Sequence, residues 1–269
     1  MKKLSVVTSL IGYHPLLLDT LKSVLNQRGV AAEDLEYVVW YGGSPNPLIN
    51  DVIETFSDRV RFLGDNDDGL YDSLAQVLPL LSGEVICYLN VGDLWSPTTA
   101  ADVINFFSTR KDCQWICGIQ SFYDETGHMK GLLVPHKFRT PFIQMGLYGK
   151  RFGFPFIQQE STFWRKELHE AIDWNRLRRF KLAGDAYLWH TFSYVTNLKV
   201  VPLLLGGIRS HSNHLSADHE AYSIERQSMN SPFRLKYLPL YLYDQVIWRL
   251  PNRVRLWLLK RQLVSSFTR

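Results

Sequence analysis

One stretch constrains the fold of this chain more than any other. Residues 64–95 contain, in order, an acidic turn, an amphipathic helix, a buried strand and a second acidic turn. The strand, residues 85–89, is a short apolar run typical of a central parallel strand with both faces covered. Asn90 and Asp93 follow it directly. In open α/β sheets ligands bind at the carboxyl ends of the strands, so we expect these two side chains to lie at a functional site.

The residues before this stretch alternate between strand-like and helix-like patterns. Apolar runs predict strands at residues 4–8, 35–41 and 60–63, and helical spacing predicts helices at residues 16–27, 50–57 and 71–81. Such alternation implies a parallel sheet with right-handed crossovers. We therefore expect an α/β fold, Rossmann-like, with a mainly parallel sheet flanked by helices.

Length and composition are those of an ordinary globular protein. The chain has 269 residues, 46% hydrophobic and 21% charged, which is enough for one large domain or a domain with an appendage. It contains no run of about 18 apolar residues and no signal-peptide cleavage site, so a cytoplasmic protein is expected. Cys87, Cys113 and Cys117 are expected to be thiols in a reducing compartment, with a zinc site or a disulfide as the alternatives.

Several short motifs occur in a particular order. They are Gly42-Gly43-Ser44 after a strand, Asp67-x-Gly69-x-Tyr71-Asp72 before a helix, Gly83-Glu84 before the next strand, Leu89-Asn90-x-Gly92-Asp93 after it, and later the segments 158–165, 182–189 and 206–211. Together they resemble the GT-A-fold glycosyltransferases of family two, most closely the bacterial polysaccharide and lipopolysaccharide members. The resemblance covers residues 3–215. It implies inverting transfer of a sugar from a nucleotide-sugar donor to a hydroxyl of a surface glycan acceptor, often lipid-linked.

Such a reaction needs stabilisation of the leaving group. Cleavage of the donor builds negative charge on a diphosphate, which a divalent cation stabilises as a Lewis acid. Oxygen ligands suit Mn2+ or Mg2+. Asp93 is the first candidate metal ligand, with Asn90 or a water where many relatives have an aspartate; in the alternative interpretation Asp93 only caps a turn. The resemblance adds His211 as a ligand of the metal or the diphosphate, although a lone histidine can be structural.

Inverting transfer also needs a base, because the acceptor hydroxyl loses its proton as it attacks. In the resembled family this base is an acidic residue at the start of a late helix, and Asp185 matches that position. Asp185 could also be the N-cap of that helix, a role compatible with catalysis. Glu160 is the second candidate for the base.

The resemblance assigns the remaining candidates to the nucleotide-sugar site. They are Thr8, Tyr41, Gly43, Asp67, Asp72, Asn90 and Arg209. Many relatives have aspartates where Tyr41 and Asn46 stand here, which leaves Asp67 as the main carboxylate able to accept from a base N–H. A UDP-sugar is the favoured donor, but this departure leaves base specificity open. Asp72 could instead be a helix cap, and Arg209 could form a surface ion pair.

The C-terminal part is basic and aromatic. Residues 232–269 contain eight Lys and Arg against the single acid Asp244, a net charge of +7 in a chain whose total is +4. Pro239 and Pro251 divide this part into short helices.

We expect a GT-A domain at residues 1–215 and a helical extension at 216–269. The extension could lie on an anionic membrane, on the inner face, or pack on the domain or a second subunit. Nucleic acid is not an expected partner, since no binding module accompanies the charge, and the oligomeric state is left open.

Two other function classes remain open from sequence. A nucleotidyltransferase would have a related sheet, but residues 10–14 are not the Gly-rich basic loop that such an enzyme carries after its first strand. A non-catalytic GT-A-like partner subunit is compatible with Tyr41 and Asn46 standing in place of acids. Hydrolysis of any nucleotide sugar by the protein would exclude the non-catalytic subunit.

Overall fold

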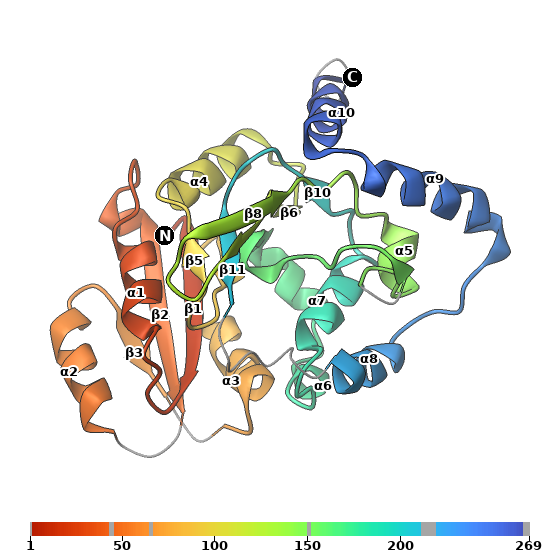
Figure 1. Cartoon of the computed structure of the whole chain (residues 1–269). Helices are drawn as coiled ribbons and strands as arrows, with labels where there is room; N and C mark the ends of the chain where they lie inside the picture. Colours follow the sequence, from red (N-terminus) through yellow and green to blue (C-terminus); the bar gives the residue numbers. More distant parts are fainter. Residues whose placement is uncertain (1, 43–45, 65–66, 150–151, 211–218, 266–269) are drawn as a thin grey trace.

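The computed structural model describes residues 2–42, 46–64, 67–149, 152–210 and 219–265 (Figure 1). Its main sheet has seven strands in the order β10-β6-β9-β4-β1-β2-β3. These strands are β1 (Leu4–Ile11), β2 (Leu35–Gly42), β3 (Arg61–Leu63), β4 (Val85–Tyr88), β6 (Trp115–Cys117), β9 (Thr162–Arg165) and β10 (Lys199–Val200). The mixed α/β architecture with a Rossmann-like half confirms the predicted fold class.

The N-terminal half of the sheet is parallel, as the alternating pattern predicts. Strand β1 pairs with β2 and β4, and β2 pairs with β3. The crossovers contain α1 (Leu17–Leu25), α2 (Pro47–Phe56) and α3 (Leu70–Val77). Strand β1 is three residues longer than predicted, because Ser9, Leu10 and Ile11 continue the pairing with Trp40, Tyr41 and Gly42 of β2. The carboxyl end of β1 is therefore Ile11, not Thr8.

The parallel arrangement is interrupted by β9, which is antiparallel to both β4 and β6. The sheet is therefore mainly parallel, as predicted, with one antiparallel strand that the alternation over residues 4–89 does not cover. All four residues of β9 are buried, and Phe163 and Trp164 are completely inaccessible. A run covered on both faces shows no alternation, so its sequence does not reveal the strand's direction.

A second, four-stranded sheet has the order β5-β11-β7-β8. Its strands are β5 (Leu94–Trp95), β7 (Gln120–Tyr123), β8 (Met129–Leu133) and β11 (Gly206–Arg209). Strand β5 begins one residue after Asp93 and pairs antiparallel with β11. The second sheet thus begins at the turn that follows the central strand β4.

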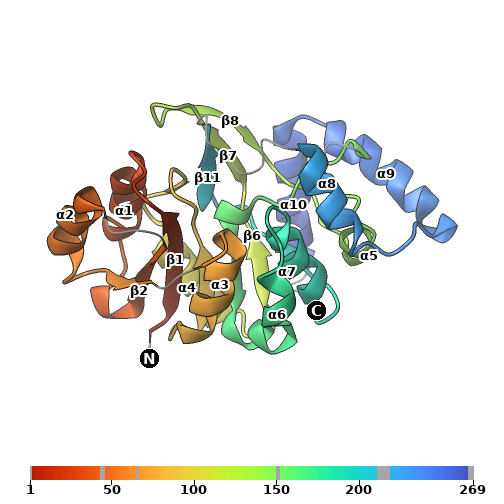
Figure 2. The same ribbon diagram turned by 90° about the horizontal axis from the view of Figure 1, so that it is seen from below.

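The remaining helices are α4 (Thr99–Thr109), α5 (Thr140–Gln144), α6 (Trp174–Leu177), α7 (Gly184–Phe192), α8 (His219–Gln227), α9 (Leu238–Arg249) and α10 (Asn252–Ser265). Short 3-10 segments lie at Ala32–Asp34, Leu78–Leu80, Gln159–Ser161, Lys166–Ala171 and Leu235–Tyr237. Figure 2 shows α3, α6 and α7 side by side, and α8 lies next to them in sea-blue. Cys87, Cys113 and Cys117 are all buried and free.

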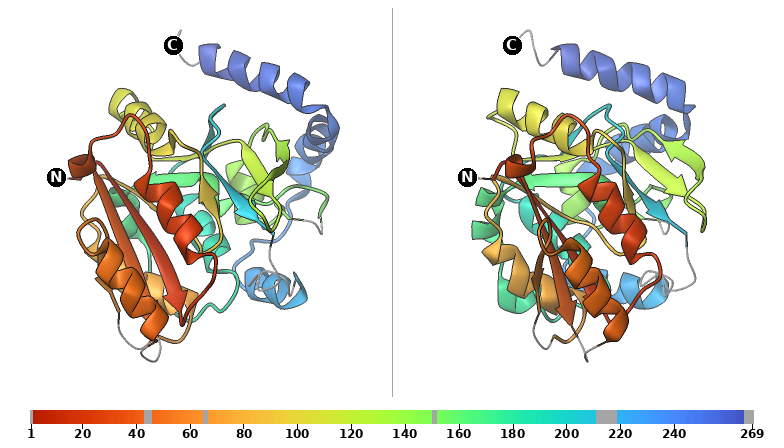
Figure 3. Two further views of the ribbon diagram at one scale, coloured as in Figure 1. Left: turned by 60° about the vertical axis from the view of Figure 1, so that its left-hand side comes forward. Right: turned by 90° about the vertical axis from the view of Figure 1, so that its left-hand side faces the viewer.

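The C-terminal extension packs its inner face on the rest of the protein, with α10 across one end of the molecule (Figure 3). Asp244 is completely buried and accepts two hydrogen bonds from the guanidinium of Arg139, from Nε at 2.6 Å and from an Nη at 2.7 Å. The ring of Trp248 lies 5.5 Å from that of Phe138. The outer face of α9 exposes apolar side chains, namely Leu238, Leu242 and Val246.

No helix among the described residues is long and apolar enough to cross a membrane. The predicted boundary at residue 215 lies outside the described residues.

Candidate active site

Asp93 lies in the turn after β4, with its side chain buried. Its Oδ1 accepts a hydrogen bond from the backbone N–H of Arg209 in β11 at 2.9 Å. The hydroxyl of Thr20 fixes the turn, because it donates to the carbonyl of Asp93 at 3.1 Å and accepts from the N–H of Gly92 at 2.8 Å. Gly92 has φ of 100°, which an L side chain rarely adopts. The turn therefore holds the Asp93 carboxylate between two strands.

Glu160 is the second buried acid of the site. It belongs to the 3-10 segment before β9, and its carboxyl lies against that of Asp93. Burial, with the neighbouring carboxyl adding to it, raises the pKa of Asp93 well above its usual range. Burial likewise raises the pKa of Glu160 to about 7. From sequence, Glu160 is only a second candidate for the base; its proximity to Asp93 depends on the antiparallel insertion of β9.

Asn90 lies beside these acids and is partly buried. Its Nδ2 donates to Oε1 of Gln159 at 3.2 Å, which fixes the orientation of the amide. The structure thus brings Asn90 and Asp93 together, as predicted from their position after the central strand. The metal-ligand candidate His211 and the nucleotide-site candidate Gly43 lie outside the described residues.

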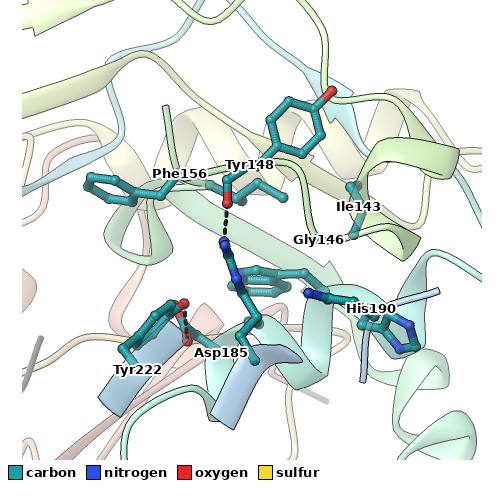
Figure 4. Close-up of a pocket in the computed structure, with 12 residues that line it drawn as sticks. Ile143, Gly146, Tyr148, Phe156, Asp185, His190 and Tyr222 are labelled. Atoms are coloured by element: carbon teal, nitrogen blue, oxygen red, sulfur yellow. Dashed lines mark hydrogen bonds between the residues drawn. The ribbon is translucent and has the colours of Figure 1, made fainter. Parts of the chain in front are cut away.

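Asp185 is in the first turn of α7 and is partly buried. The N-cap position belongs to Ala183, so the N-cap role considered for Asp185 is wrong. The Asp185 Oδ1 accepts from the hydroxyl of Tyr222 in α8 at 3.0 Å (Figure 4) and, at 3.5 Å, from that of Tyr71 in α3. Burial raises the pKa of Asp185 to about 6, although these hydrogen bonds and the N–H of Ala186 favour the carboxylate.

Helix α8 holds the loop that precedes Asp185. The carboxylate of Glu225 accepts from three successive backbone N–H groups, those of Lys181 at 2.7 Å, Leu182 at 2.9 Å and Ala183 at 2.7 Å. A side chain from another helix therefore fixes the loop that leads into α7. No local sequence signal could reveal this contact, because Glu225 lies about 40 residues downstream.

Two buried tyrosines connect the two acidic parts of the site. The hydroxyl of Tyr71 interacts with that of Tyr88, which lies near both Glu160 and Asp185. Burial raises the pKa of each phenol well above its ordinary value, so both stay neutral. Neighbouring side chains thus form one continuous, mostly buried polar cluster, which consists of Asp93, Glu160, Tyr88, Tyr71 and Asp185.

The crevice beside Asp185 is lined mostly by apolar and aromatic side chains (Figure 4). Phe156, Tyr222 and His190 lie around it, and the guanidinium of Arg226 hydrogen-bonds to the carbonyl of Tyr148. The lining thus combines aromatic side chains with polar groups. Such a lining suits a ligand with both apolar faces and hydroxyls, such as a sugar.

Asp67 and Asp72 are at the acidic turn before α3. Asp67 is partly exposed, and its carboxylate accepts from Nε1 of Trp40 at 3.0 Å and from the N–H of Gly69 at 3.1 Å. Asp72 accepts from Nε of Arg178 at 2.7 Å and from the N–H of Asp68 at 2.9 Å. Burial opposes ionisation of Asp72, but these hydrogen bonds and Arg178 lower its pKa overall. Asp72 lies inside α3, whose N-cap is Gly69, so it is not the cap residue of that helix.

The other nucleotide-site candidates differ in position. Thr8 is completely buried within β1, and its hydroxyl hydrogen-bonds to that of Tyr37 at 3.0 Å. Its side chain therefore does not lie at the carboxyl end of the sheet, where a ligand would bind. The guanidinium of Arg209 is bound by Asp19 at 2.7 Å and by the carbonyl of Glu125, which is the ion-pair alternative. Tyr41 is partly buried near the end of β2. Asn46 is the N-cap of α2 and accepts from the N–H of Leu48.

The donor atoms near Asp93 fit an oxygen-preferring cation. Asp93 and Glu160 supply carboxylate oxygens and Asn90 an amide, which are ligands that Mg2+ and Mn2+ prefer. Among the described residues, no three His, Cys, Asp or Glu side chains cluster closely enough to enclose a metal by themselves. A cation here would therefore need further ligands, from a substrate, from water or from residues outside the described part of the chain.

Fold and site together define a glycosyltransferase with the GT-A fold. The profile described as Glycosyl transferase family 2 matches residues 5–185, well over half of the chain, and the chain belongs to this family. The matched span ends at Asp185 and includes Asp93 and Glu160. The comparison with curated proteins found no match.

Solved structures with the same fold include those of S. aureus TarS. TarS 1-349 in complex with UDP-GlcNAc has a TM-score of 0.63 at 14% identity, with 91% of this chain and 71% of that chain covered. TarS 1-349 in complex with UDP has a TM-score of 0.58 at 13% identity, with 91% and 70% covered. Against the longer S. aureus TarS structure, the chain spans 50% of its length, at 13% identity and a TM-score of 0.56.

Proposed function

We propose that this protein is a metal-dependent, inverting glycosyltransferase that moves a sugar from a nucleotide-sugar donor to a hydroxyl of a bacterial surface glycan. The observation that carries the proposal is the partly buried Asp185 at the start of α7, beside a crevice and joined by tyrosines to a second acidic centre at Asp93. Inverting transfer needs two such centres, one for the acceptor proton and one for the leaving group.

Asp185 is the base in this proposal. With a pKa of about 6, its carboxylate is largely ionised at neutral pH yet basic enough to accept a proton from a hydroxyl as attack proceeds. The crevice lined by Phe156, Tyr222 and His190 opens beside it, so an acceptor sugar there could present its hydroxyl to Asp185.

Asp93 would hold Mn2+ or Mg2+, with His211 as a further ligand and Asn90 nearby. When bound, the cation supplies Lewis-acid stabilisation of the diphosphate leaving group. The role of this chain's residues is to place the carboxylate: the N–H of Arg209 and the hydroxyl of Thr20 fix the Asp93 side chain and its turn.

A UDP-sugar is the leading candidate for the donor. The likeness to S. aureus TarS, solved with UDP-GlcNAc and with UDP, supports this choice. In this proposal Asp67 accepts a hydrogen bond from the nucleoside base, and its bonds to Trp40 and Gly69 leave lone pairs for a base N–H. Tyr41, near the end of β2, would stack on the base or ribose.

The acceptor is proposed to be lipid-linked, with the enzyme on the inner face of the membrane. In support, the outer face of α9 exposes Leu238, Leu242 and Val246. The only acid of residues 232–269, Asp244, is buried in its pair with Arg139, so the surface charge of the extension is positive. Apolar side chains among basic ones favour contact with anionic lipid.

The test replaces Asp185 by Asn. Transfer with Mn2+ should fall by about a hundredfold or more, because the amide cannot accept a proton. Affinity for UDP, measured by calorimetry, should stay within a few fold, because the donor site is intact. The matched control is Asp173→Asn at the N-cap of α6, which is exposed and outside the site. Full activity of folded Asp185→Asn would contradict the assignment and make Glu160 the next base to test.

A further inference from the structure

We propose that Glu160 is a second carboxylate ligand of the divalent cation, together with Asp93. This inference rests on the metal dependence proposed above. The ligand it adds is an acid from the 3-10 segment before β9, more than 60 residues after Asp93 in the chain.

The first observation is that two buried carboxyl groups face each other with no cationic side chain. Asp93 and Glu160 are only 2% and 5% exposed. Neither takes part in any ion pair within the described ranges of the chain. The guanidinium of Arg209 points instead to Asp19 and to the carbonyl of Glu125. A buried pair of carboxyl groups is stabilised either by a proton held between them or by a metal, and a divalent cation would take the place of that proton.

The second observation is an unsatisfied oxygen. Oε2 of Glu160 is inaccessible to solvent and has no hydrogen-bond partner in the part of the chain that the structure describes. A buried carboxylate oxygen without a partner is costly, whereas a metal–oxygen bond would satisfy it. This oxygen belongs to the carboxyl that contacts Asp93, so a cation could bind both side chains.

The backbone around Glu160 is fixed as a metal site requires. Gln158 exchanges two hydrogen bonds with the backbone of Ser121, at 3.1 and 2.9 Å, and Gln159 bonds to the carbonyl of Tyr88. Gly206 of β11 lies so close that a Cβ there would be 2.2 Å from the carbonyl oxygen of Glu160. Neighbouring strands thus hold the segment, and the carboxylate is pre-positioned.

The number of carboxylates also fits. Mg2+ is commonly bound by one or two protein carboxylates together with substrate phosphates and waters. Asn90 is neutral, and its Nδ2 is used by Gln159, so it adds no charge. Asp93 supplies one negative charge, and Glu160 supplies the second one, which the neutral Asn90 cannot supply.

The experiment measures Mn2+ binding to the full chain in the presence of UDP, by the enhancement of water-proton relaxation that protein-bound Mn2+ causes. Glu160→Gln should raise the dissociation constant for Mn2+ by at least about tenfold, as expected for loss of a metal ligand. The matched control is Glu167→Gln, an exposed glutamate seven residues further on, which should bind like wild type.

Thermal denaturation distinguishes ligation from a structural role. In EDTA, Glu160→Gln should melt at or above the wild-type temperature, because an amide next to Asp93 removes a like charge. Mn2+ with UDP should raise the melting temperature of wild type and of Glu167→Gln more than that of Glu160→Gln.

The outcomes separate this inference from the function it rests on. If wild type binds Mn2+, Asp93→Asn does not, and Glu160→Gln binds like wild type, Glu160 is not a ligand and the metal dependence stands. If wild type binds no Mn2+ in the millimolar range, both proposals fail. A Glu160→Gln protein that melts well below wild type in EDTA would also refute the inference, since Glu160 would then be stabilising without a metal.

Discussion

The hydrogen bond from Tyr222 to Asp185 should tune the base, and Tyr222→Phe tests this directly. The phenol donates to the charged form of Asp185 at 3.0 Å, so its removal should raise the pKa of the carboxyl. The ring itself remains, which preserves packing in the crevice. Transfer requires the deprotonated base, so the rate should fall as pH decreases through this pKa.

The size of the shift follows from the bond that is lost. A hydrogen bond to a charged group contributes about 1.5 to 3 kcal/mol, and one pKa unit corresponds to about 1.4 kcal/mol. Partial exposure of Asp185 and the remaining donors, Tyr71 and the N–H of Ala186, favour the lower end of this range. The acid limb of the pH profile should therefore move from about pH 6 in wild type by about one unit upward.

The assay follows kcat/KM for transfer, or for hydrolysis of the nucleotide sugar, between about pH 5 and pH 9 with saturating Mn2+. The charged and titratable groups around Asp185 are Tyr71 of α3, Tyr88 of β4, Glu160 before β9, and Glu225 and Arg226 of α8. Glu160 also titrates near neutral pH, so the profile is repeated in the Glu160→Gln background.

The control is Tyr194→Phe, which removes the hydroxyl of an exposed tyrosine two residues after the end of α7. Its acid limb should coincide with that of wild type. A Tyr222→Phe enzyme with an unmoved limb, or one moved to lower pH, would show that this hydrogen bond does not act on the catalytic carboxyl. A lower rate with an unchanged limb would indicate a structural effect only.

Four further predictions concern single side chains. Asp93→Asn should keep the fold but lower turnover by orders of magnitude, which rates at saturating donor will show. Asp67→Ala should raise the dissociation constant for UDP about tenfold by calorimetry, and equal affinity would place Asp67 outside the nucleoside pocket. Asp244→Ala leaves Arg139 unpaired at a mostly buried site, and urea denaturation should show a loss of about 3 to 5 kcal/mol. Asp185→Asn should melt a few degrees higher than wild type at pH 7.5. The pKa of Asp185 is about 6 in the folded protein and lower in the unfolded chain, so its ionisation destabilises the folded protein, with the full cost present above pH 6. The difference in melting temperature should vanish toward pH 4, where the carboxyl is protonated in the folded protein.

The parallel half of the fold could be predicted because its patterns are local. Alternating apolar runs and helical spacing identify β1 to β4 and their helices, and the turn after β4 places Asp93 at the carboxyl end of a central strand. The sequence predicts that β1 ends too soon, because Ser9 and Gly12 are typical of a turn after a strand. Its true length follows from pairing with β2 rather than from its own residues.

The parts that sequence did not predict depend on contacts between distant segments. The residues 162–165 are compatible with either strand direction, so the antiparallel β9, and with it the meeting of Glu160 and Asp93, could not be anticipated. Arg209 pairs with Asp19 across 190 residues. Tyr222 and Glu225 belong to a short polar helix with no motif of its own, and only the folded chain places them at α7.

The hold that Glu225 has on the loop before α7 has a consequence for how such an enzyme can be altered. The family match ends at Asp185, yet the groups that hold this residue from the outside belong to α8, beyond the matched span. Substitutions in α8 should therefore change the pKa and the placement of Asp185 while the sheet is left as it is. If Asp185 is the base, as proposed, α8 is the part to randomise when a new acceptor is sought with an unchanged donor. A protein shortened before α8 would keep the matched sequence but lose the side chains of Tyr222 and Glu225.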